Sequence, residues 1–402
     1  MTFFHWIAGT ILALAWFSRI VDAALGMPSV ADVSRPEWDR NRVSREGNPR
    51  VSIIVPARNE EGSIEQAVNT LLALESDNYE VIVVNDRSTD RTGEILERLS
   101  QNLHPVAQNA TRVGHPPLRV IHHAELPSGW LGKTHAMWTG ANQATGEWLL
   151  FTDADVLFKP DSLRRALAYA EAVSADHLVL FPRMIMKRPG EYMMIAFFQT
   201  MFLFGHRPWR VADPSTDDHM GVGAFNLIRR SVYEKVGTYA ALRMEVLDDM
   251  KLGKVVKNAG FRQRNVFGGD LISIRWAQGA MGVVNNLTKN FFAILSFQWW
   301  RTLISALGLA FINLGPFLGL CLAQGWARLP YAVALGSMFL VYVGMSWYST
   351  VPVYYFLLHP VSAALFVYIL LRSMVLTLWN DGIEWRGTKY PLEELRKGMV
   401  RG

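Results

Sequence analysis

Two aspartates one residue apart, Asp153 and Asp155, follow an apolar run within the segment Gly146 to Phe158. The run Trp148 to Phe151 has the length and the bounding turn residues of a buried strand, so both carboxylates are expected at its C-terminal end. Such a pair suits Mg²⁺ or Mn²⁺, which takes one or two carboxylates and leaves its other positions to substrate phosphates. The pair therefore predicts a nucleotide-diphosphate substrate, although a solvated turn after a strand would use the same residue types.

A second acidic pair, Asp248 and Asp249, lies in the first turn of the helix predicted for EVLDDMKLGKVVKNAGFR, which ends near Gly260. The helix dipole alone favours carboxylates there, so the pair has a structural interpretation beside a catalytic one. Lys133 opens another predicted helix, Lys133 to Ala144. Its charge would lie next to backbone N–H groups, which suits a phosphate, whereas a solvated lysine is the alternative.

The elements that must position these residues alternate between strands and helices. Apolar runs predict strands at Val51 to Val55, Val81 to Val84, Leu118 to His122 and Leu178 to Phe181, and a further strand is expected around Arg264 to Ile274. The helix after the first strand has apolar residues at helical spacing, namely Ile64, Ala67, Val68, Leu71 and Leu72. The alternation predicts an α/β fold with a parallel sheet and right-handed crossovers. Ligands of such sheets bind beyond the carboxyl ends of the strands, where the sequence has Arg58, Asn59 and Glu60 after one strand and Asn85 and Asp86 after the next.

Long apolar segments flank this region of the 402-residue chain, which is 50% hydrophobic with a mean hydropathy of +0.12. Phe3 to Ala24 is long enough to span a bilayer. It has no Lys or Arg before it and several Arg after it, so the positive-inside rule places Met1 outside and the next domain in the cytoplasm. A cleaved signal peptide is the alternative, but the basic n-region is missing. Further spans are expected at Leu303 to Leu322, Tyr331 to Trp347 and Val353 to Leu371.

Two other apolar segments are not expected to span. Glu191 to Phe204 is too short, so it is either a core helix or a helix lying in the membrane interface. Ala277 to Trp300 predicts an amphipathic interfacial helix. The basic C-terminal tail should face the cytoplasm, yet four full spans after an outside N-terminus would place it outside. One C-terminal segment must therefore be re-entrant or interfacial, or the charge rule fails.

Several classes of protein are excluded by the same residues. The net charge is +5, but the basic residues are scattered and no recognition motif accompanies them, so nucleic acid is not an expected partner. Cys321 is the single cysteine, which excludes a disulfide framework or a thiolate metal site. The first strand-to-helix turn reads PARNEEGS and lacks the Gly-x-Gly-x-x-Gly loop of dinucleotide-binding oxidoreductases.

Taken in order, these motifs resemble those of the inverting family 2 glycosyltransferases with a GT-A fold. The resemblance rests on VSIIVPARNEE, VIVVNDRSTDRT, GWLGKTHA, GEWLLFTDADV and EVLDDMKLGKVVKNAGFR, which cover about Arg50 to Arg264. The membrane-anchored layout and the strings NNLTKNFFA and WRGTKY are similar to the bacterial hopanoid-associated and carotenoid-type lipid glycosyltransferases, and more distantly to ceramide glucosyltransferase. A mixed, mostly parallel Rossmann-like sheet flanked by helices is the fold that this implies.

The resemblance also implies a role for each residue. Asp86 would accept a hydrogen bond from the nucleoside, which Pro56, Arg58 and Glu60 would wall. Asp155 would ligate Mg²⁺ or Mn²⁺ between the donor phosphates, Asp153 would face the ribose or the metal and its water, and Lys133 would add positive charge. Asp249 would be the general base, with Asp248 as the close alternative. The shell around donor sugar and acceptor would comprise Gly221, Gly223, Phe225 and Asn226.

The organisation implied is a transmembrane anchor (1–27), a juxtamembrane linker (28–50), a GT-A domain (51–275), an amphipathic interfacial helix (276–302), transmembrane helices (303–379) and a basic cytosolic tail (380–402). The implied activity is transfer of one sugar from a nucleotide-sugar, with UDP-sugars expected, to a membrane lipid hydroxyl at the inner (plasma) membrane. A processive polysaccharide synthase is the alternative, but its Gln/Arg-x-x-Arg-Trp motif has only the imperfect matches ISIRW and QWWRT here. A catalytically inactive nucleotide-sugar-binding protein would be expected to lack Asp155 or Asp249.

Overall fold

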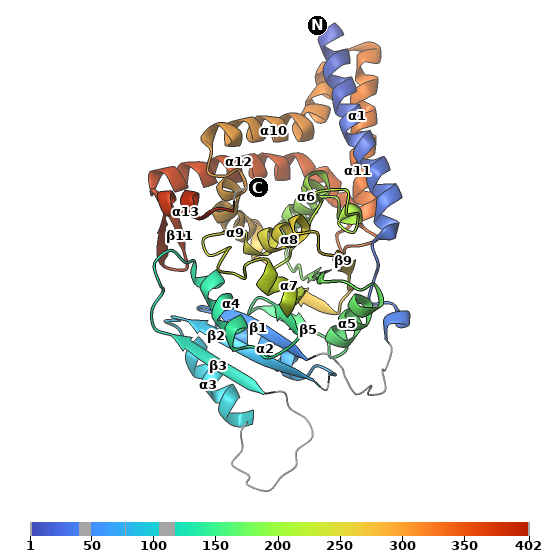
Figure 1. The fold of residues 1–402 in the computed structure, drawn as a ribbon. Coiled ribbons are helices and arrows are strands. Elements are labelled where there is room, and N and C mark those ends of the chain that lie inside the picture. The colour runs from blue at the N-terminus through green and yellow to red at the C-terminus, as the bar shows by residue number, and fades with distance from the viewer. Residues whose placement is uncertain (1, 40–49, 77, 104–116, 401–402) are drawn as a thin grey trace.

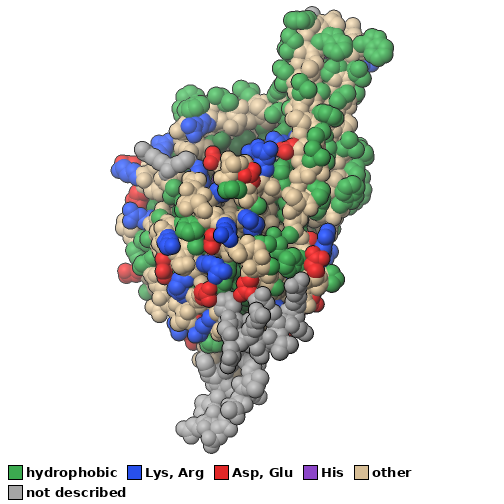
Figure 2. Space-filling view, turned by 45° about the vertical axis from the view of Figure 1, so that its right-hand side comes forward, with side chains coloured by type: hydrophobic (Ala, Val, Ile, Leu, Met, Phe, Trp, Pro, Cys, Tyr) green, Lys and Arg blue, Asp and Glu red, His purple; other side chains and the backbone are tan. Residues whose placement is uncertain are grey.

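The computed structural model describes residues 2–39, 50–76, 78–103 and 117–400. A body built around a β-sheet lies below a layer of helices, and a column containing α1 (Thr2–Gly26) and α11 (Leu329–Met345) projects from that layer (Figure 1). Hydrophobic side chains cover the column, whereas Lys, Arg, Asp and Glu gather on the body (Figure 2). Residues 40–49 of the expected linker lie outside the described residues.

The central sheet has seven strands in the order β3-β2-β1-β4-β8-β6-β9. Their bounds are β1 (Val51–Ala57), β2 (Tyr79–Asp86), β3 (Leu118–His123), β4 (Trp148–Phe151), β6 (His177–Phe181), β8 (Asn226–Arg229) and β9 (Gln263–Phe267). Only β8 among these strands runs antiparallel to its neighbours, β4 and β6. The expected α/β fold with a mixed, mostly parallel sheet is therefore confirmed.

Buried side chains on both faces explain why the central strands are continuous apolar runs. Ile53 and Val55 point into one core, and Ile54 of the same strand points into the other. The helices on these faces include α2 (Ile64–Leu72), α3 (Thr92–Leu103), α4 (Gly132–Gln143), α5 (Ser162–Ala172), α7 (Arg230–Lys235) and α8 (Asp248–Asn258). All five apolar residues expected on the inner face of α2 are buried.

The strand expected around Arg264 to Ile274 is two strands in different sheets, so that expectation is wrong. β9 belongs to the central sheet, whereas β10 (Ile272–Ile274) pairs with β5 (Val156–Phe158) and β7 (Arg183–Met184). Gly268 and Gly269 separate β9 from β10, and Gly269 has φ +53°. Glycine adopts this left-handed backbone without a Cβ penalty, which allows the chain to change sheets.

Within the described part of the chain, four helical segments are long and apolar enough to cross a membrane: Thr2–Ser29, Trp299–Leu322, Gly325–Met345 and Val353–Trp379. The second is α10 (Trp299–Leu322), which has Pro316 in its interior. Proline has no N–H to donate to the carbonyl of Ile312 four residues earlier, and the indole N–H of Trp16 in α1 donates to that oxygen at 2.9 Å instead. This hydrogen bond holds α10 against α1. From there the chain continues towards the N-terminal end of α1.

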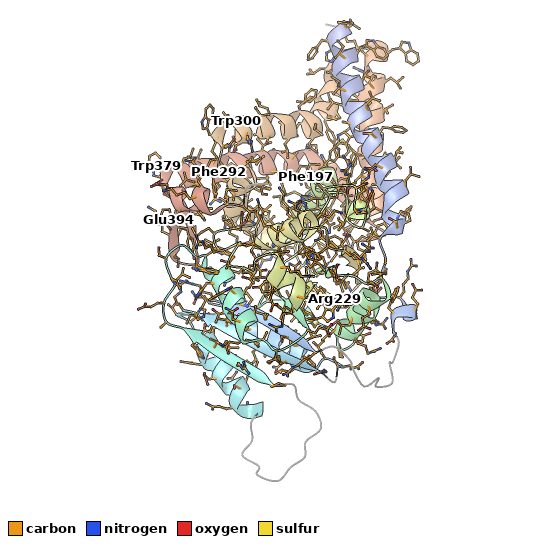
Figure 3. All side chains as sticks on the ribbon, viewed as in Figure 1. Phe197, Arg229, Phe292, Trp300, Trp379 and Glu394 are labelled. Carbon is orange, nitrogen blue, oxygen red and sulfur yellow. The ribbon has the colours of Figure 1, made fainter. Side chains whose placement is uncertain are left out.

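α1 and α11 run parallel to each other. The imidazole of His5, near the start of α1, is 3.1 Å from the hydroxyl of Tyr331, near the start of α11. By contrast, α12 (His359–Trp379) runs across the top of the body rather than along the column (Figure 1). Trp300 in α10 and Trp379 at the end of α12 lie towards the same edge of the molecule (Figure 3) and are 47% and 86% exposed.

The C-terminal tail folds back onto the body. It forms a hairpin, β11 (Gly382–Trp385) and β12 (Thr388–Pro391), and a short helix, α13 (Leu392–Gly398). The backbone N–H of Gly132 in α4 donates to the hydroxyl of Tyr390 at 3.1 Å. The tail therefore packs on the same body as the central sheet, so we expect both to lie on one side of the membrane.

The two shorter apolar segments pack within the molecule. α6 (Pro189–Gly205) buries Phe197 completely, with its ring 4.6 Å from that of Phe366 in α12, so the core alternative holds (Figure 3). The single interfacial helix expected over 276–302 is divided between α9 (Gly279–Ile294) and α10. Ser296 and Phe297 between them have φ of 58° and 55°, which neither helix can accommodate.

Candidate active site

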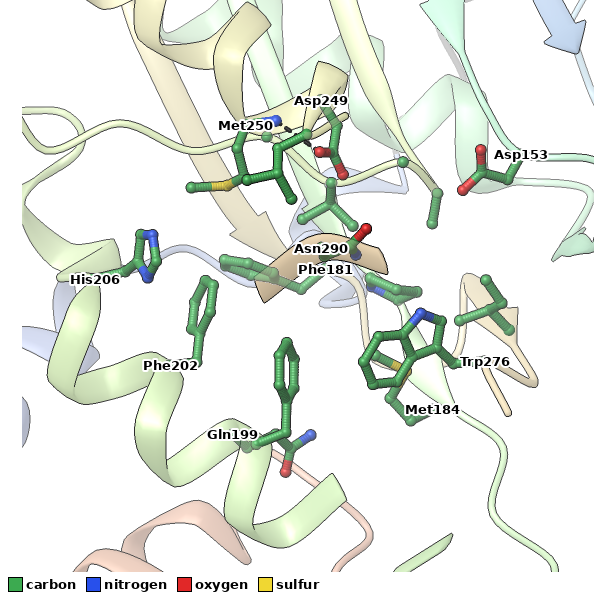
Figure 4. Close-up of a pocket in the computed structure, with 18 of the residues that line it drawn as sticks. Asp153, Phe181, Met184, Gln199, Phe202, His206, Asp249, Met250, Trp276 and Asn290 are labelled. Atoms are coloured by element: carbon green, nitrogen blue, oxygen red, sulfur yellow. Dashed lines mark hydrogen bonds between the residues drawn. The ribbon is translucent and has the colours of Figure 1, made fainter. Parts of the chain in front are cut away.

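The carboxyl ends of β1, β2 and β4 meet the N-terminal ends of α4 and α8 at one cavity of about 1400 Å³. Most of the expected site residues line it, namely Pro56, Arg58, Glu60, Asp86, Lys133, Asp153, Asp155, Gly221, Gly223, Asp248 and Asp249. Asp153 and Asp249 face the space that Trp276 and Phe202 also border (Figure 4). Site residues up to 193 positions apart in sequence, from Pro56 to Asp249, are thus brought together at the strand ends.

Lys133 links the two acidic pairs. Its Nζ is 2.8 Å from Oδ1 of Asp153 and 3.4 Å from Oδ1 of Asp248. Burial disfavours the ammonium, but the surrounding carboxylates outweigh it and hold the pKa of Lys133 above its ordinary value. In turn, burial acts to raise the pKa of Asp153, and the ammonium outweighs it and lowers that pKa. Lys133 is therefore a charged group that keeps Asp153 ionised.

The pKa values of Asp248 and Asp249 lie above that of an ordinary aspartate. Burial, with the neighbouring Asp249 and Asp153, raises the pKa of Asp248 to about 7 against the opposing effect of Lys133. Burial also raises the pKa of Asp249, whose Oδ1 accepts a hydrogen bond from the backbone N–H of Met250 at 2.7 Å. A carboxylate with a raised pKa accepts a proton near neutral pH more effectively than a normal one.

Asp155 lies in a site where a cation is chemically favoured. Burial, followed by the charges of Asp153 and Glu60, raises the pKa of Asp155 to about 7. Several acidic groups thus face one another, and a divalent cation would relieve their repulsion. Among the described residues no group of three or more His, Cys, Asp or Glu could hold a metal by itself. Asp155 and Asp153 fit a cation that takes its other ligands from a bound phosphate group.

Asp86 is bound by two arginines. Arg87 donates from Nε to Oδ1 at 2.8 Å and from Nη2 to Oδ2 at 3.0 Å, and Nη1 of Arg58 is 3.4 Å from Oδ2. Burial acts to raise the pKa of Asp86, but these cations outweigh it, so the pKa is lowered and the carboxylate stays ionised. The role of Arg87 was not expected from the sequence, in which it reads as an ordinary turn residue.

Gly221 and Gly223 are required by close approaches within the protein. A Cβ on Gly221 would lie 1.8 Å from the carbonyl oxygen of Asp249, and a Cβ on Gly223 would lie 2.4 Å from Oδ2 of Asp153. The N–H of Asp153 also donates to the carbonyl of Gly223 at 3.0 Å. These glycines therefore let the 221–223 backbone support both acidic pairs.

Phe225 and Asn226 do not line the cavity, and their expected place in the shell is corrected. Phe225 is fully buried in the core beneath the sheet. Asn226 is 1% exposed; its Oδ1 is 3.1 Å from Nε2 of His177, and its Nδ2 donates to the carbonyl of Val222 at 3.0 Å. They follow Gly223 into β8, so their side chains point into the interior.

The cavity extends from the acidic groups to the apolar helices. Its apolar arm is formed by residues of α1, α6 and α11, including Ala23, Ala24, Phe198, Phe202, Val341 and Gly344. Trp276, from the imperfect motif ISIRW, borders the cavity (Figure 4). Arg275 beside it forms an ion pair with Glu191 at 3.1 Å. A polar site and an apolar channel are thus parts of one space.

The lining residues outside the expected site include four polar or aromatic ones from late in the chain: Lys289 in α9, and Trp385, Arg386 and Tyr390 in the C-terminal hairpin. Arg386 forms an ion pair with Glu60 and donates to the carbonyl of Arg58. The string WRGTKY contains three of these four residues, but no local pattern indicates that it reaches a turn more than 300 residues earlier.

The fold is that of the GT-A glycosyltransferases. A mannosyltransferase from Pyrobaculum calidifontis, solved in complex with GDP-Man and Mn²⁺, matches with a TM-score of 0.52 at 18% identity over 94% of this chain and 99% of that chain. Residues 52–237 match the family model described as Glycosyl transferase family 2. That region is therefore a family 2 glycosyltransferase domain, and the chain is a glycosyltransferase.

Proteins named 4,4'-diaponeurosporenoate glycosyltransferase are among the similar sequences. The one from Staphylococcus aureus (strain MRSA252) is 22% identical over 398 residues, which are 95% of this chain and 100% of that protein. The one from Staphylococcus haemolyticus (strain JCSC1435) is 23% identical over 256 residues, which are 63% of this chain and 64% of that protein. The similarity to the first extends over the apolar helices as well as the glycosyltransferase domain.

Proposed function

We propose that this chain transfers one sugar from a nucleotide-diphosphate sugar to a lipid in the membrane that its apolar helices enter. The observation that carries the proposal is the single cavity, which joins the carboxylates at the strand ends to an apolar arm between α1, α6 and α11. A polar donor and an apolar acceptor can meet in such a space without crossing water. UDP-sugars are the first donors to test.

A carotenoid-type lipid hydroxyl is the acceptor that we propose. Support comes from the relatives named for 4,4'-diaponeurosporenoate, whose similarity includes the helices that form the apolar arm. A long apolar acceptor would place its chain between Phe198 and Gly344 and its reactive end beside Asp249. Each acceptor is proposed to leave after one transfer, because ISIRW and QWWRT match the motif of processive synthases only imperfectly.

Asp249 is proposed to be the general base. Its Oδ1 is fixed by the Met250 N–H, which orients the carboxylate in the cavity. It would remove the proton from the acceptor hydroxyl while that oxygen attacks the anomeric carbon from the face opposite the leaving diphosphate, so the configuration inverts. Asp248 is less suited to this role because Lys133 binds its Oδ1.

The proposed donor site consists of Asp86 with Pro56, Arg58 and Glu60 around the nucleoside, and Lys133 near the phosphates. Asp155, with Asp153, would hold Mg²⁺ or Mn²⁺, which supplies charge neutralisation for the departing diphosphate. The ammonium of Lys133 contributes positive charge of its own and keeps Asp153 ionised. The acidic cluster would thus bind a nucleotide-diphosphate sugar together with its divalent cation.

The proposed location is the inner (plasma) membrane, with the catalytic domain in the cytoplasm and the N-terminus outside. The support is the group of arginines that follows the first apolar segment, since basic residues flanking a span favour the cytoplasmic side. Nucleotide-sugars would then reach the site from the cytoplasm, while the lipid enters sideways from the bilayer.

Membranes that contain the full chain test this proposal with radiolabelled UDP-sugars, Mn²⁺ and a lipid extract. We expect label in the organic phase as one discrete species, and Asp249→Asn should reduce its formation by about 10²- to 10⁴-fold, as for loss of a general base. Asp217→Asn, an exposed aspartate outside the cavity, is the matched control and should retain activity.

The pH profile of the same reaction gives a second check. Asp249 must be ionised to accept a proton, and its pKa is raised, so the rate should fall on the acid side at a higher pH than an ordinary aspartate would give. Label in a large water-soluble polymer would contradict transfer of a single sugar. No label in either phase with any donor would favour a nucleotide-sugar-binding protein instead.

A further inference from the structure

The tip of the C-terminal hairpin has a backbone conformation that its sequence does not favour. Arg386 and Gly387 connect β11 to β12 as a two-residue turn, with φ of 48° and 73°. A turn with positive φ at both positions favours Asn or Gly at the first, because a larger side chain pays a steric penalty there. An arginine in this position therefore suggests a requirement for its side chain.

The Arg386 guanidinium lies over the donor side of the cavity. It forms an ion pair with Glu60 and donates to the carbonyl of Arg58, both in the turn after β1. Its charge also acts on Asp153 and Asp155. The group is thus close to the acidic cluster where the donor diphosphate is proposed to lie.

Lys289 of α9 lies beside the hairpin, with its Nζ 4.1 Å from the centre of the Trp385 ring. Burial, together with the charges of Lys133 and Arg386, lowers the pKa of Lys289 to about 8. Lys133, Lys289 and Arg386 all line the cavity, and an anion bound between them would offset the repulsion of these three cations.

Hydrogen bonds to the rest of the protein hold the hairpin and the tail that follows it in place. The hydroxyl of Tyr390 accepts from the first N–H of α4, Arg396 of α13 donates to the carbonyl of Phe297 at 2.9 Å, and Lys251 of α8 donates to the carbonyl of Val400 at 3.1 Å. The backbone of the tip is therefore positioned by the folded tail, while the Arg386 side chain, 41% exposed, can exchange partners.

We propose that Arg386, with Lys289 beside it, binds the diphosphate of the nucleotide-sugar, and that Arg386 leaves Glu60 and the Arg58 carbonyl to do so. The inference rests on the proposed function. It assigns to the C-terminal hairpin a positively charged group that neither ISIRW nor QWWRT supplies, since Arg275 of the first string is bound to Glu191 and Arg301 of the second does not line the cavity.

Binding of UDP and UMP, and of GDP and GMP, to the detergent-solubilised full chain with Mn²⁺ tests the inference. The variant Arg386→Asn removes the cation and replaces it with a residue that the turn favours, so the hairpin should stay at least as stable as in the wild type. We expect it to weaken binding of the preferred nucleoside diphosphate by about 10- to 100-fold, as for loss of a charge-assisted hydrogen bond, and that of the monophosphate by less than about threefold.

Lys289→Met should act in the same direction as Arg386→Asn. Lys389→Gln, on an exposed position of the same hairpin, is the matched control and should bind like the wild type. Equal weakening of diphosphate and monophosphate binding, or unchanged binding of both, would overturn the inference while leaving the proposed function intact. If the wild type binds none of the four nucleotides, the proposed function fails and the inference fails with it.

Discussion

At the scale of single residues, the carboxylates of the site depend on one cation, Lys133. Asp153 and Asp248 both contact it, and their side chains are only 31% and 4% exposed. Without the ammonium, these groups and Asp249 would be like charges in a partly buried space. The lysine therefore has a structural effect in addition to its proposed role near the phosphates.

Lys133→Met should destabilise the protein by roughly 2 kcal/mol at pH 8, somewhat below the cost of breaking a fully buried ion pair. The remaining carboxylates would have raised pKa values in the folded state. The free-energy cost of ionising them therefore grows as pH rises through those values and shrinks as pH falls. Thermal unfolding at pH 8 and pH 5.5 should therefore show a smaller difference from the wild type at the lower pH.

The matched control is Lys159→Met, which breaks the surface pair with Asp270, 2.6 Å long with both side chains 49% exposed. An exposed pair contributes about 0–1 kcal/mol, so this variant should unfold close to the wild type. If Lys133→Met is no less stable than Lys159→Met at pH 8, the carboxylates do not depend on the lysine as described.

The sequence predicted residues that follow strands better than residues that arrive from elsewhere. Asp153, Asp155 and Asp86 were located because each directly follows a buried apolar run. Arg386 and Lys289 could not be placed at the site, because their contacts join segments far apart in the chain. Phe225 and Asn226 were misplaced because the pattern around Gly223 does not reveal the residue at which the backbone enters β8.

At the scale of elements, a buried hydrogen-bonded chain links the segment before β8 to α8. His177 of β6 is 2.7 Å from Nε2 of Gln263 in β9 and 3.1 Å from Oδ1 of Asn226 in β8. Gln263 also accepts from the N–H of Met220 at 2.8 Å and donates to the carbonyl of Gly253 at 3.0 Å. A neutral imidazole satisfies this arrangement, since Nδ1 faces an amide N–H and Nε2–H faces an amide oxygen.

Acid should weaken the fold through His177. Burial lowers its pKa to about 4 in the folded state, whereas an unfolded histidine has a pKa of about 6.5. Between these values the unfolded chain binds the proton and the folded protein does not, so stability is complete above pH 6.5 and is lost as pH falls towards 4, by up to about 3 kcal/mol. His177→Gln should flatten this loss, measured as the melting temperature between pH 7.5 and pH 5. If the melting temperature of His177→Gln falls by as much as that of the wild type over this pH range, His177 is not the cause.

The bounds of strands with a clear apolar pattern were predicted closely from the sequence. The turns that separate neighbouring elements were not. β4 begins and ends at the predicted residues, Trp148 and Phe151, because a short apolar run bounded by turn residues has few alternatives. The apolar stretches around residues 268 and 296 were read as continuous, although the backbone turns there at Gly269 and at Ser296 and Phe297. Tertiary packing sets the positive φ at Ser296 and Phe297, and the apolar pattern of the sequence does not indicate it.

At the scale of the whole molecule, the arrangement of the helices gives a membrane topology. α1, the later part of α10 and α11 form the projecting column, whereas α12 runs across the body and the tail returns to the sheet (Figure 1). We infer that α12 lies in the membrane interface, where the exposed Trp379 would suit it. Three crossings would then leave the basic tail on the same side of the membrane as the catalytic domain, which is the cytoplasmic side in the proposed orientation.

Single-cysteine labelling checks this topology in a Cys321→Ser background. Trp326→Cys, at an 80% exposed position between α10 and α11, should react with a membrane-impermeant maleimide in intact cells. Glu394→Cys, on the exposed face of α13, should react only after the cells are opened. Labelling of both positions from the same side would contradict the inferred topology.

The central claim is that donor and lipid meet in one cavity, and filling its apolar arm tests that claim most directly. Gly344 in α11 lines the arm, and a Cβ there would have nothing within 4 Å. Gly336 in the same helix is equally open but does not line the cavity, so Gly336→Phe is the matched control for Gly344→Phe. Each variant would be assayed for sugar transfer to lipid and for hydrolysis of the nucleotide-sugar without lipid. The account predicts that Gly344→Phe loses transfer by at least about tenfold and keeps hydrolysis, as expected when a pocket is blocked rather than the chemistry. Transfer that persists in Gly344→Phe, or parallel loss of transfer and hydrolysis, would contradict it.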